Sequence, residues 1–179
     1  MTETEITETI TIPEGVTVSI ENKTVHVKGD KGELSKTLAH PRITLQCKDK
    51  AVIISCTDSP KRKEKALIGT FRAHINNMIL GVTNGFEYTM KTVYAHFPIK
   101  TSVDGNSFII QNFLGERSPR TAKIIDGVTV ETKGDDVTVS GIDKEKVGQT
   151  VANIERATKV KKRDIRVFQD GVYLTSKGG

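Results

Sequence analysis

The chain contains two copies of one segment, and this duplication constrains its fold more than any other feature of its 179 residues. Residues 43–58 have the sequence ITLQCKDKAVIISCTD, residues 128–143 have the sequence VTVETKGDDVTVSGID, and the two align without a gap. Upstream, residues 18–35 match residues 101–118 at nearly the same offset. Because the two matches occur in the same order, they indicate an internal repeat of one structural unit.

Each copy is predicted to begin with antiparallel strands. In the first copy, apolar and polar residues alternate over 16–20 and 24–28, which predicts a hairpin, and a short strand follows at 34–38. A second hairpin is predicted from 43–47 and 51–55. Side chains alternate across a strand, so one face of each hairpin can cover a hydrophobic core.

A helix is predicted late in each copy. In the first copy Ser59 suits the N-cap, Pro60 the first helical position and Gly81 the C-cap, around a buried stripe of Ile68, Phe71, Ile75 and Met78. In the second copy Asp143 is the predicted N-cap, and the stripe consists of Val147, Val151 and Ile154. After the helices, strands are predicted at 86–97, 165–168 and 172–175.

Strands that precede one late helix, without alternating βαβ units, favour an antiparallel sheet. We therefore predict an α+β fold with two tandem duplicated domains, each an antiparallel β-sheet with one helix packed on a face. The predicted boundaries are an acidic N-terminal tail at 1–9, an N-terminal α+β repeat at 10–83 and a C-terminal α+β repeat at 84–179. The strand at 86–97 should bridge the two domains.

Composition excludes several classes of protein. No apolar run approaches the roughly 20 residues that a transmembrane helix needs, so no membrane partner is expected. The start, MTETEITETI, is acidic and lacks the apolar region of a secretory signal, so the expected location is the cytoplasm. Cys47 and Cys56 lie in apolar segments without a histidine at metal spacing, which favours buried reduced thiols over a zinc site or a disulfide.

No catalytic arrangement is recognisable in the sequence. The four histidines, His26, His40, His74 and His96, are scattered and never reach a metal-binding spacing. Asp135 and Asp136 are interpreted as the tip of a hairpin, and residues 29–32 lack the Lys-Ser/Thr pair of a phosphate loop. We therefore expect no enzyme, no metal, no cofactor and no small-molecule substrate.

The net charge of +5 is concentrated near the C-terminus. Residues 156–173 hold six cations against two aspartates; the cations are Arg156, Lys159, Lys161, Lys162, Arg163 and Arg166. A localised basic run on a chain otherwise close to neutral is typical of a surface that binds a polyanion, the alternative being a solvated helix end and loop. After the first helix the chain instead has NNMILGVTNGF, with no cation, so the second copy is the predicted binding half.

Two further groups of cations accompany this run. Arg117, Arg120 and Lys123 belong to the segment NFLGERSPRTAK, where guanidinium groups suit bidentate phosphate contacts, although a solvated loop is the alternative. Lys61, Arg62 and Lys63 face the positive end of the first helix dipole, which is unfavourable without an external anion. This last group is a candidate second contact for RNA or protein.

Three segments, RAHINNMILGVTNGF, NFLGERSPR and ERATKVKKRDIRVFQDGVY, resemble the archaeal and eukaryotic branch of the ribosomal protein L6 family of the large subunit. The resemblance extends over residues 11–174 and includes the duplicated domain. It implies a structural protein whose C-terminal domain docks on large-subunit ribosomal RNA near the factor-binding, sarcin–ricin region. VKKRDIRVFQDG replaces the GPEPYKGKG-like motif of the bacterial branch, which favours an archaeal member.

The resemblance also implies which residues face RNA and which partners to expect. The RNA-facing loop falls on residues 159–166 with Gln169, Asp170 and Gly171, and an arginine-bearing loop falls on Arg117 and Arg120. The implied partners are ribosomal RNA, neighbouring ribosomal proteins and translation factors. Recognition by shape and charge is expected, with Val167, Phe168, Val172 and Tyr173 as core strand residues instead of base-stacking platforms. The alternative function is a duplicated protein-interaction module without RNA binding, in which exposed strand edges recruit a partner.

Overall fold

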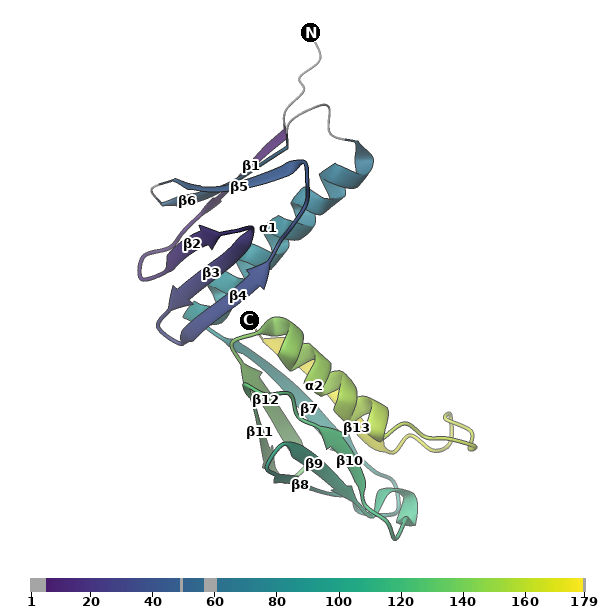
Figure 1. Cartoon of the computed structure of the whole chain (residues 1–179). Helices are drawn as coiled ribbons and strands as arrows, with labels where there is room; N and C mark the ends of the chain where they lie inside the picture. Colours follow the sequence, from purple (N-terminus) through teal and green to yellow (C-terminus); the bar gives the residue numbers. More distant parts are fainter. Residues whose placement is uncertain (1–5, 49, 57–60, 179) are drawn as a thin grey trace. The chain divides into compact units, whose positions relative to one another are not determined.

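The computed structural model describes residues 6–48, 50–56 and 61–178, which form two compact units (Figure 1). Unit 1 extends to Asn84 and unit 2 begins at Gly85, one residue beyond the predicted boundary. Each unit combines antiparallel strands with one long helix, so the predicted duplicated α+β fold is confirmed. Among the described residues, each unit holds two small sheets instead of the single predicted sheet.

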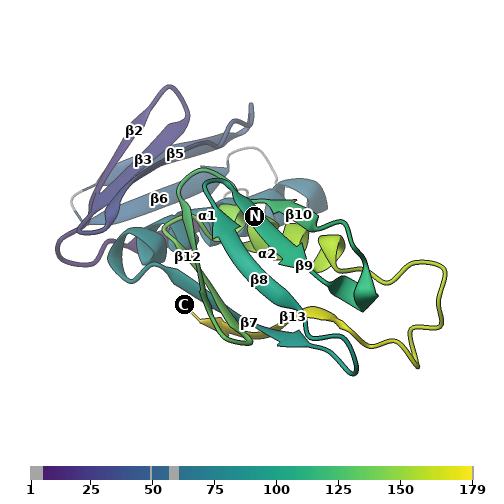
Figure 2. The same ribbon diagram turned by 90° about the horizontal axis from the view of Figure 1, so that it is seen from below.

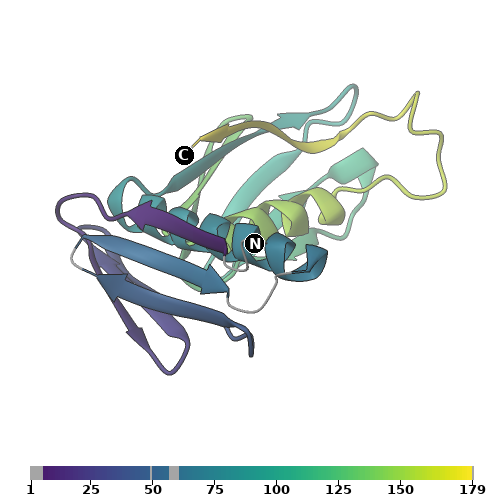
Figure 3. The same cartoon turned by 90° about the horizontal axis from the view of Figure 1, so that it is seen from above.

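Unit 1 packs two three-stranded sheets and a helix around one core. The first sheet has the order β1-β6-β5, and its strands lie side by side (Figure 3): β1 (Ile6–Thr11), β6 (Ala51–Cys56) and β5 (Ile43–Lys48). The second sheet consists of β2 (Thr17–Glu21), β3 (Thr24–Gly29) and β4 (Gly32–Thr37). Helix α1 (Arg62–Thr83) contacts both sheets, and the buried residues Val25, Val52 and Ile75 lie in the core between them.

Unit 2 repeats this plan and adds one strand. Its three-stranded sheet consists of β8 (Lys100–Asp104), β9 (Ser107–Gln111) and β10 (Arg120–Lys123). Its four-stranded sheet has the order β11-β12-β7-β13: β11 (Val128–Lys133), β12 (Asp136–Gly141), β7 (Phe86–Val93) and β13 (Gly171–Gly178). Helix α2 (Lys144–Ala157) covers both sheets, and its Ile154 is fully buried in the core with Phe108 and Met90 of the strands.

The duplication holds strand by strand where the sequence match is gapless. β5 and β6 correspond to β11 and β12, and β2 and β3 correspond to β8 and β9. β1 and β7 also correspond, because β1 pairs antiparallel with β6 and β7 pairs antiparallel with β12. β13 pairs with the other edge of β7, so the four-stranded sheet extends past the plan of the first copy. The strand predicted to bridge the domains is therefore the second central strand of the unit 2 sheet.

The sequence match at residues 115–118 does not correspond to a shared structure. In unit 1 a tight turn joins β3 to β4, because Gly29 pairs with Gly32. In unit 2 the first pair is Ile110 with Arg120, which leaves a long connection that contains the short 3-10 helix η1 (Phe113–Gly115). Unit 2 thus carries a loop that its duplicate lacks.

Several predicted boundaries in unit 1 are corrected by packing. The predicted tail is too long, because β1 begins at Ile6, pairs with β6 and buries Ile10. Helix α1 does not end at Gly81: it continues to Thr83, since Val82 is buried and packs against Gly29. The predicted caps Ser59 and Pro60 lie outside the described residues.

The second helix begins as predicted. Asp143 is the N-cap of α2, and its carboxylate accepts a hydrogen bond of 2.9 Å from the backbone N–H of Glu145. A cap of this kind stabilises a protein by about 1 kcal/mol. After α2 the predicted strand at 165–168 is absent from the described structure, and β13 begins only at Gly171. β7 likewise stops at Val93 instead of residue 97.

Candidate nucleic-acid interface

Three connections gather at one end of unit 2 (Figures 1 and 2). We name them by their residues: the 94–98 loop follows β7, the 112–119 loop precedes β10, and the 158–170 loop joins α2 to β13. The first two loops are joined by a hydrogen bond of 3.0 Å from the Asn112 amide to the carbonyl of Pro98. The first and third are adjacent because Val93, at the end of β7, pairs with Gly171, at the start of β13.

Arg120 fastens the 112–119 loop to the 158–170 loop. Its Nη1 donates to the carbonyl oxygens of Ala157 at 3.0 Å and Lys159 at 3.1 Å. Its Nε and Nη2 donate to the two carboxylate oxygens of Glu116 at 2.8 and 2.6 Å. The guanidinium lies 4.2 Å from the ring centroid of Phe113, and the side chain is only 23% exposed. The structure therefore directs Arg120 inward, as a residue that positions both loops.

The Glu116–Arg120 pair makes the stability of unit 2 dependent on pH. The hydrogen bond from Arg120 holds the pKa of Glu116 below its ordinary value, and the charges of Arg120 and Arg163 lower this pKa further. A carboxyl group whose pKa is lower in the folded state stabilises the protein above its unfolded pKa, and this contribution is lost as pH falls through the folded pKa. Since the Glu116 side chain is 42% exposed, solvent screens part of the effect.

We expect Glu116→Gln to lower the melting temperature at neutral pH, with the difference from wild type closing as the solution is acidified. Thermal unfolding followed by circular dichroism across the acid range measures this difference. The matched control introduces Glu116→Gln into the Arg120→Met background, where the same change should produce a much smaller pH-dependent difference, because only the charge of Arg163 still lowers the pKa of Glu116. A wild-type advantage that stays constant down to strongly acid pH would refute the coupling.

The two ends of the 158–170 loop, where it leaves α2 and enters β13, are held together by hydrogen bonds between polar groups. The Thr158 hydroxyl is buried, donates to the carbonyl of Glu155 at 3.2 Å and accepts from the N–H of Val172 at 3.1 Å. The carboxylate of Glu155 accepts from the N–H of Leu174 at 3.0 Å. These contacts join the end of α2 to the start of β13, so the loop projects from a rigid base.

The tip of the same loop is organised around Asp164. Its carboxylate accepts from the backbone N–H of Arg166 at 2.9 Å and pairs with the Arg166 guanidinium at 3.0 Å, and these hydrogen bonds hold the pKa of Asp164 below its usual range. Its carbonyl accepts from the N–H groups of Val167 and Phe168. Lys162 adopts a left-handed backbone with φ of 59°. The turn thus keeps a compact, hydrogen-bonded shape.

Six of the nine cations predicted for unit 2 lie exposed on these two loops. Arg117 is exposed on the 112–119 loop. The exposed cations of the 158–170 loop are Lys159, Lys161, Lys162, Arg163 and Arg166. Arg163 also lies 4.8 Å from the ring centroid of Phe168, and its charge acts on Glu116 of the neighbouring loop. The structure therefore brings cations from segments about forty residues apart in the sequence to one end of unit 2.

The other predicted residues have different surroundings. Arg156 is exposed on the last turn of α2, beside a groove of about 530 Å³ between this helix and the 158–170 loop. Lys123 lies at the end of β10 away from the 112–119 loop, where its carbonyl accepts from Asn153. Gln169 donates to the carbonyl of Arg166 at 3.2 Å. Gly171 is buried, and a Cβ there would lie 3.0 Å from the ring of Tyr173.

The third predicted group of cations belongs to unit 1. Lys61 is the N-cap of α1 and makes no side-chain cap hydrogen bond, and Arg62 and Lys63 follow it in the first turn. All three side chains are exposed. In this part of unit 1 Arg42 and Glu64 form an ion pair of 3.7 Å, and backbone hydrogen bonding, with the charge of Arg42, holds the pKa of Glu64 below its ordinary value.

Exposed apolar residues at this end of unit 2 were missed by the sequence pattern. Ile165 and Val167 are 69% and 70% exposed, so the prediction that Val167 is a core strand residue is wrong. Tyr173 lies in β13 but is 45% exposed, so it is not a core residue either, whereas Val172 is buried in β13 as predicted. Tyr94 and Phe97 are 39% and 40% exposed on the 94–98 loop. The alternation at 165–168 suggested a strand, but these residues precede Gly171, where pairing with β7 begins.

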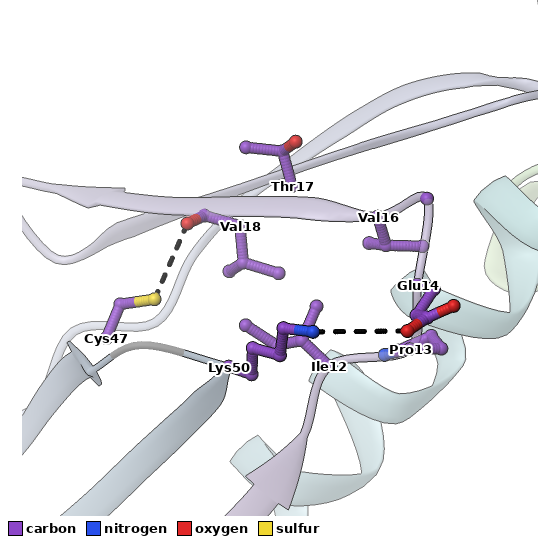
Figure 4. Close-up of a pocket in the computed structure, with 9 residues that line it drawn as sticks. Ile12, Pro13, Glu14, Val16, Thr17, Val18, Cys47 and Lys50 are labelled. Carbon is purple, nitrogen blue, oxygen red and sulfur yellow. Dashed lines mark hydrogen bonds and ion pairs between the residues drawn. The ribbon is translucent and has the colours of Figure 1, made fainter.

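The rest of the described surface contains no catalytic arrangement that we recognise. Within residues 6–48, 50–56 and 61–178, no three His, Cys, Asp or Glu side chains lie close enough to hold a metal ion. A pocket of about 390 Å³ in unit 1 is lined mainly by residues 12–18, Cys47 and Lys50 (Figure 4). Cys47 is exposed there, contrary to prediction, and its thiol donates to the carbonyl of Val18 at 3.5 Å, whereas Cys56 is buried. None of the helices in the described part of the chain has the length and apolar character needed to span a bilayer.

Fold and surface together define a duplicated α+β protein with a cationic end on its second unit. The profile of the family described as "Ribosomal protein L6" matches residues 12–85 and again residues 97–171. The chain therefore belongs to the ribosomal protein L6 family, as the sequence resemblance predicted. The two matches fall on the two units, so both copies in this chain are instances of the same family domain.

Curated relatives agree with this assignment over nearly the full chain. A protein of Methanobrevibacter smithii is 55% identical over 172 residues, covering 96% of this chain and 96% of the relative. A Methanosphaera stadtmanae protein is 55% identical over 97% of this chain and 94% of the relative, and a Methanococcus vannielii protein is 51% identical over 97% and 95%. Each of the three is described as large ribosomal subunit protein uL6. These methanogens are archaea, so the predicted archaeal branch is confirmed, as is the predicted location on the cytoplasmic ribosome.

Proposed function

We propose that unit 2 binds large-subunit ribosomal RNA near the factor-binding, sarcin–ricin region, and that the chain acts there as a structural component without catalysis. The observation that carries this proposal is the cationic end of unit 2, where the basic 158–170 loop and the 112–119 loop, which bears Arg117, are fastened to each other by Arg120. The family assignment supports the ribosomal context, because the curated relatives are large-subunit proteins.

Loops with a fixed backbone are suited to binding RNA. Arg117, Lys161, Lys162 and Arg163 are exposed on loops whose backbone is already fixed, so binding RNA requires little ordering of the protein. Each phosphate that a cation neutralises releases counterions, which supplies affinity that depends strongly on salt. Duplex RNA presents its phosphates and 2′-hydroxyls in a regular shape, and a fixed set of cations recognises that shape without reading bases.

The remaining candidate residues serve this surface in different ways. Arg156, Lys159 and Arg166 extend the surface along α2 and the 158–170 loop, and Lys123 adds charge at its margin. Gln169 and Gly171 maintain the shape of the loop end through the contacts described above. Arg120 positions the loops and makes no contact with phosphate.

Protein contacts are a further part of the proposal. Ile165 and Val167 are the most exposed of the large apolar side chains that the structure describes, which favours a neighbouring ribosomal protein or a translation factor as an additional partner of the loop tip. The cations Lys61, Arg62 and Lys63 offer unit 1 a second contact for RNA or protein. These contacts would supplement RNA binding, whereas the alternative function, a protein-interaction module, needs no RNA at all.

Equilibrium binding of the full chain to two RNA hairpins tests the proposal. One hairpin has the sequence of the sarcin–ricin stem of an archaeal large-subunit ribosomal RNA, and the other has the same length and base composition in permuted order. We expect tighter binding to the first hairpin. Equal affinity for both would refute the proposed location, and the absence of binding to either at low salt would refute RNA binding and favour the protein-interaction module.

A further inference from the structure

The 94–98 loop displays aromatic rings that the fold does not bury. Tyr94 and Phe97 keep about two fifths of their surface exposed, and His96 between them is exposed as well. The His96 and Phe97 rings pack edge to face, with centroids 4.8 Å apart and planes at 85°. Aromatic side chains contribute most when buried, so several exposed rings in five residues indicate a surface that becomes covered on binding.

Phe97 is held in place by the neighbouring 112–119 loop. A Cβ built at Gly115 would lie 3.2 to 3.3 Å from three atoms of the Phe97 ring, so the ring rests on backbone where a side chain would have to displace it. Gly115 also has φ of 77°, a left-handed conformation that favours glycine. The Asn112 amide bonds the carbonyl of Pro98, and Ile99 is buried directly after it. The ring is therefore fixed before any partner arrives.

The rings lie between the two cation-bearing loops. Arg117 follows two residues after Gly115, the residue on which Phe97 rests. On the other side, Val93 immediately precedes Tyr94 and pairs with Gly171, where the 158–170 loop ends. Figure 2 shows the three connections at the same end of unit 2. Aromatic faces flanked by cations on both sides match a polynucleotide, whose phosphates meet cations while an unstacked base meets a ring.

We infer that Tyr94 and Phe97 form a stacking site for unpaired nucleobases of the RNA that unit 2 binds. The inference rests on the proposed RNA binding and names the class of RNA: a duplex interrupted by a bulge or loop. Bases inside a continuous duplex already stack on each other, so only an unpaired base gains by stacking on a protein ring. The cations hold the backbone of the duplex, and the rings hold the bases that leave it.

Two RNA hairpins with an identical stem test this inference on the full chain. One is fully paired, and the other carries a bulge of three adenosines whose middle base is replaced by the fluorescent analogue 2-aminopurine. We expect wild type to bind the bulged hairpin about tenfold more tightly, since stacking on a ring typically contributes this much per base. The fluorescence of 2-aminopurine should fall on binding, because stacking quenches it.

Matched variants distinguish the contribution of the aromatic rings to binding from that of the other residues of the 94–98 loop. Tyr94→Leu with Phe97→Leu keeps apolar volume but removes the aromatic faces, so it should lose the preference and the quenching while binding the paired hairpin as wild type does. Tyr94→Phe with Phe97→Tyr keeps both rings and should retain the preference and quenching. Chemical denaturation of each variant verifies that unit 2 remains folded. The ratio of the two affinities should not change with salt, since stacking releases no counterions.

The outcomes distinguish this inference from the proposed function. If the wild-type protein binds both hairpins equally, the stacking site is refuted but RNA binding is not. The same conclusion follows if the variant with Tyr94→Leu and Phe97→Leu still prefers the bulged hairpin. Equal loss of affinity for both hairpins in the leucine variant also overturns it, because the rings would then serve general binding or a protein contact. Wild type that binds neither hairpin overturns both proposals.

Discussion

Replacing Lys161, Lys162 and Arg163 together by glutamate is expected to weaken binding to a ribosomal RNA hairpin by about three orders of magnitude at low salt. The three side chains are exposed at the tip of the 158–170 loop, so the change removes phosphate contacts and adds repulsion at the same place. The loop should keep its shape, because its hydrogen bonds run through Thr158, Asp164 and Arg120, and the internal contact that the change removes is that of Arg163 with the Phe168 ring. Fluorescence anisotropy with a labelled hairpin measures the affinity.

A control with the same change of net charge separates the loop from general electrostatics. Lys28, Lys48 and Lys50 are exposed on unit 1, and their combined replacement by glutamate alters the charge of the chain equally. We expect this control to lower affinity by less than tenfold. If both triple variants lost the same affinity, binding would reflect net charge alone, and the assignment of the 158–170 loop would fail.

Replacing Arg120 by methionine is expected to destabilise the chain by about 2 kcal/mol, measured by denaturant unfolding, and to weaken RNA binding as well. Methionine keeps much of the volume but leaves the carbonyl groups of Ala157 and Lys159 and the carboxylate of Glu116 without their donors. The Arg120 side chain is only 23% exposed, so losing its hydrogen bonds costs more than losing a surface ion pair, although solvent screens the Glu116 carboxylate, which is 42% exposed. RNA affinity falls because the 112–119 loop with Arg117 and the basic 158–170 loop are no longer held together.

Comparison with Arg120→Lys and Arg117→Met identifies the role of Arg120. A lysine in its place keeps the charge but cannot maintain the forked contacts, so Arg120→Lys should remain destabilised. Arg117 is exposed, and Arg117→Met should lower RNA affinity without changing the free energy of unfolding. A fully stable Arg120→Met variant with reduced RNA affinity would instead make Arg120 a phosphate ligand, as the sequence suggested.

The predictions from sequence succeeded where structure depends on local patterns. β5 and β6 follow from alternation alone, and the match to residues 128–143 places β11 and β12 in the same way. Asp143 was identified as an N-cap because its capping bond reaches only two residues along the chain. The error at the end of α1 arose because burial of Val82 against Gly29, which is distant in sequence, extends the helix past Gly81.

The clustered cations in the sequence predict where the candidate interface lies, but the sequence does not show how the loops are held together. Charge patterning identifies the basic 158–170 loop, since its cations are clustered in the sequence. The role of Arg120 depends on carbonyl groups 37 and 39 residues away, and no local pattern indicates those contacts. The sequence predicts a strand that includes Tyr94 and Phe97, because strand-forming apolar and aromatic residues continue past Val93, whereas the strand ends where its pairing with Gly171 ends.

The salt dependence of RNA binding tests the central claim, that the cationic end of unit 2 binds RNA by neutralising phosphates. The logarithm of the association constant for a ribosomal RNA hairpin is measured against the logarithm of salt concentration, for wild type and for the Lys161→Glu, Lys162→Glu, Arg163→Glu variant. We predict a steep negative slope for wild type that becomes shallower by about two to three in the variant, close to one for each phosphate that the variant no longer neutralises. Identical slopes and affinities for the two proteins would contradict the claim.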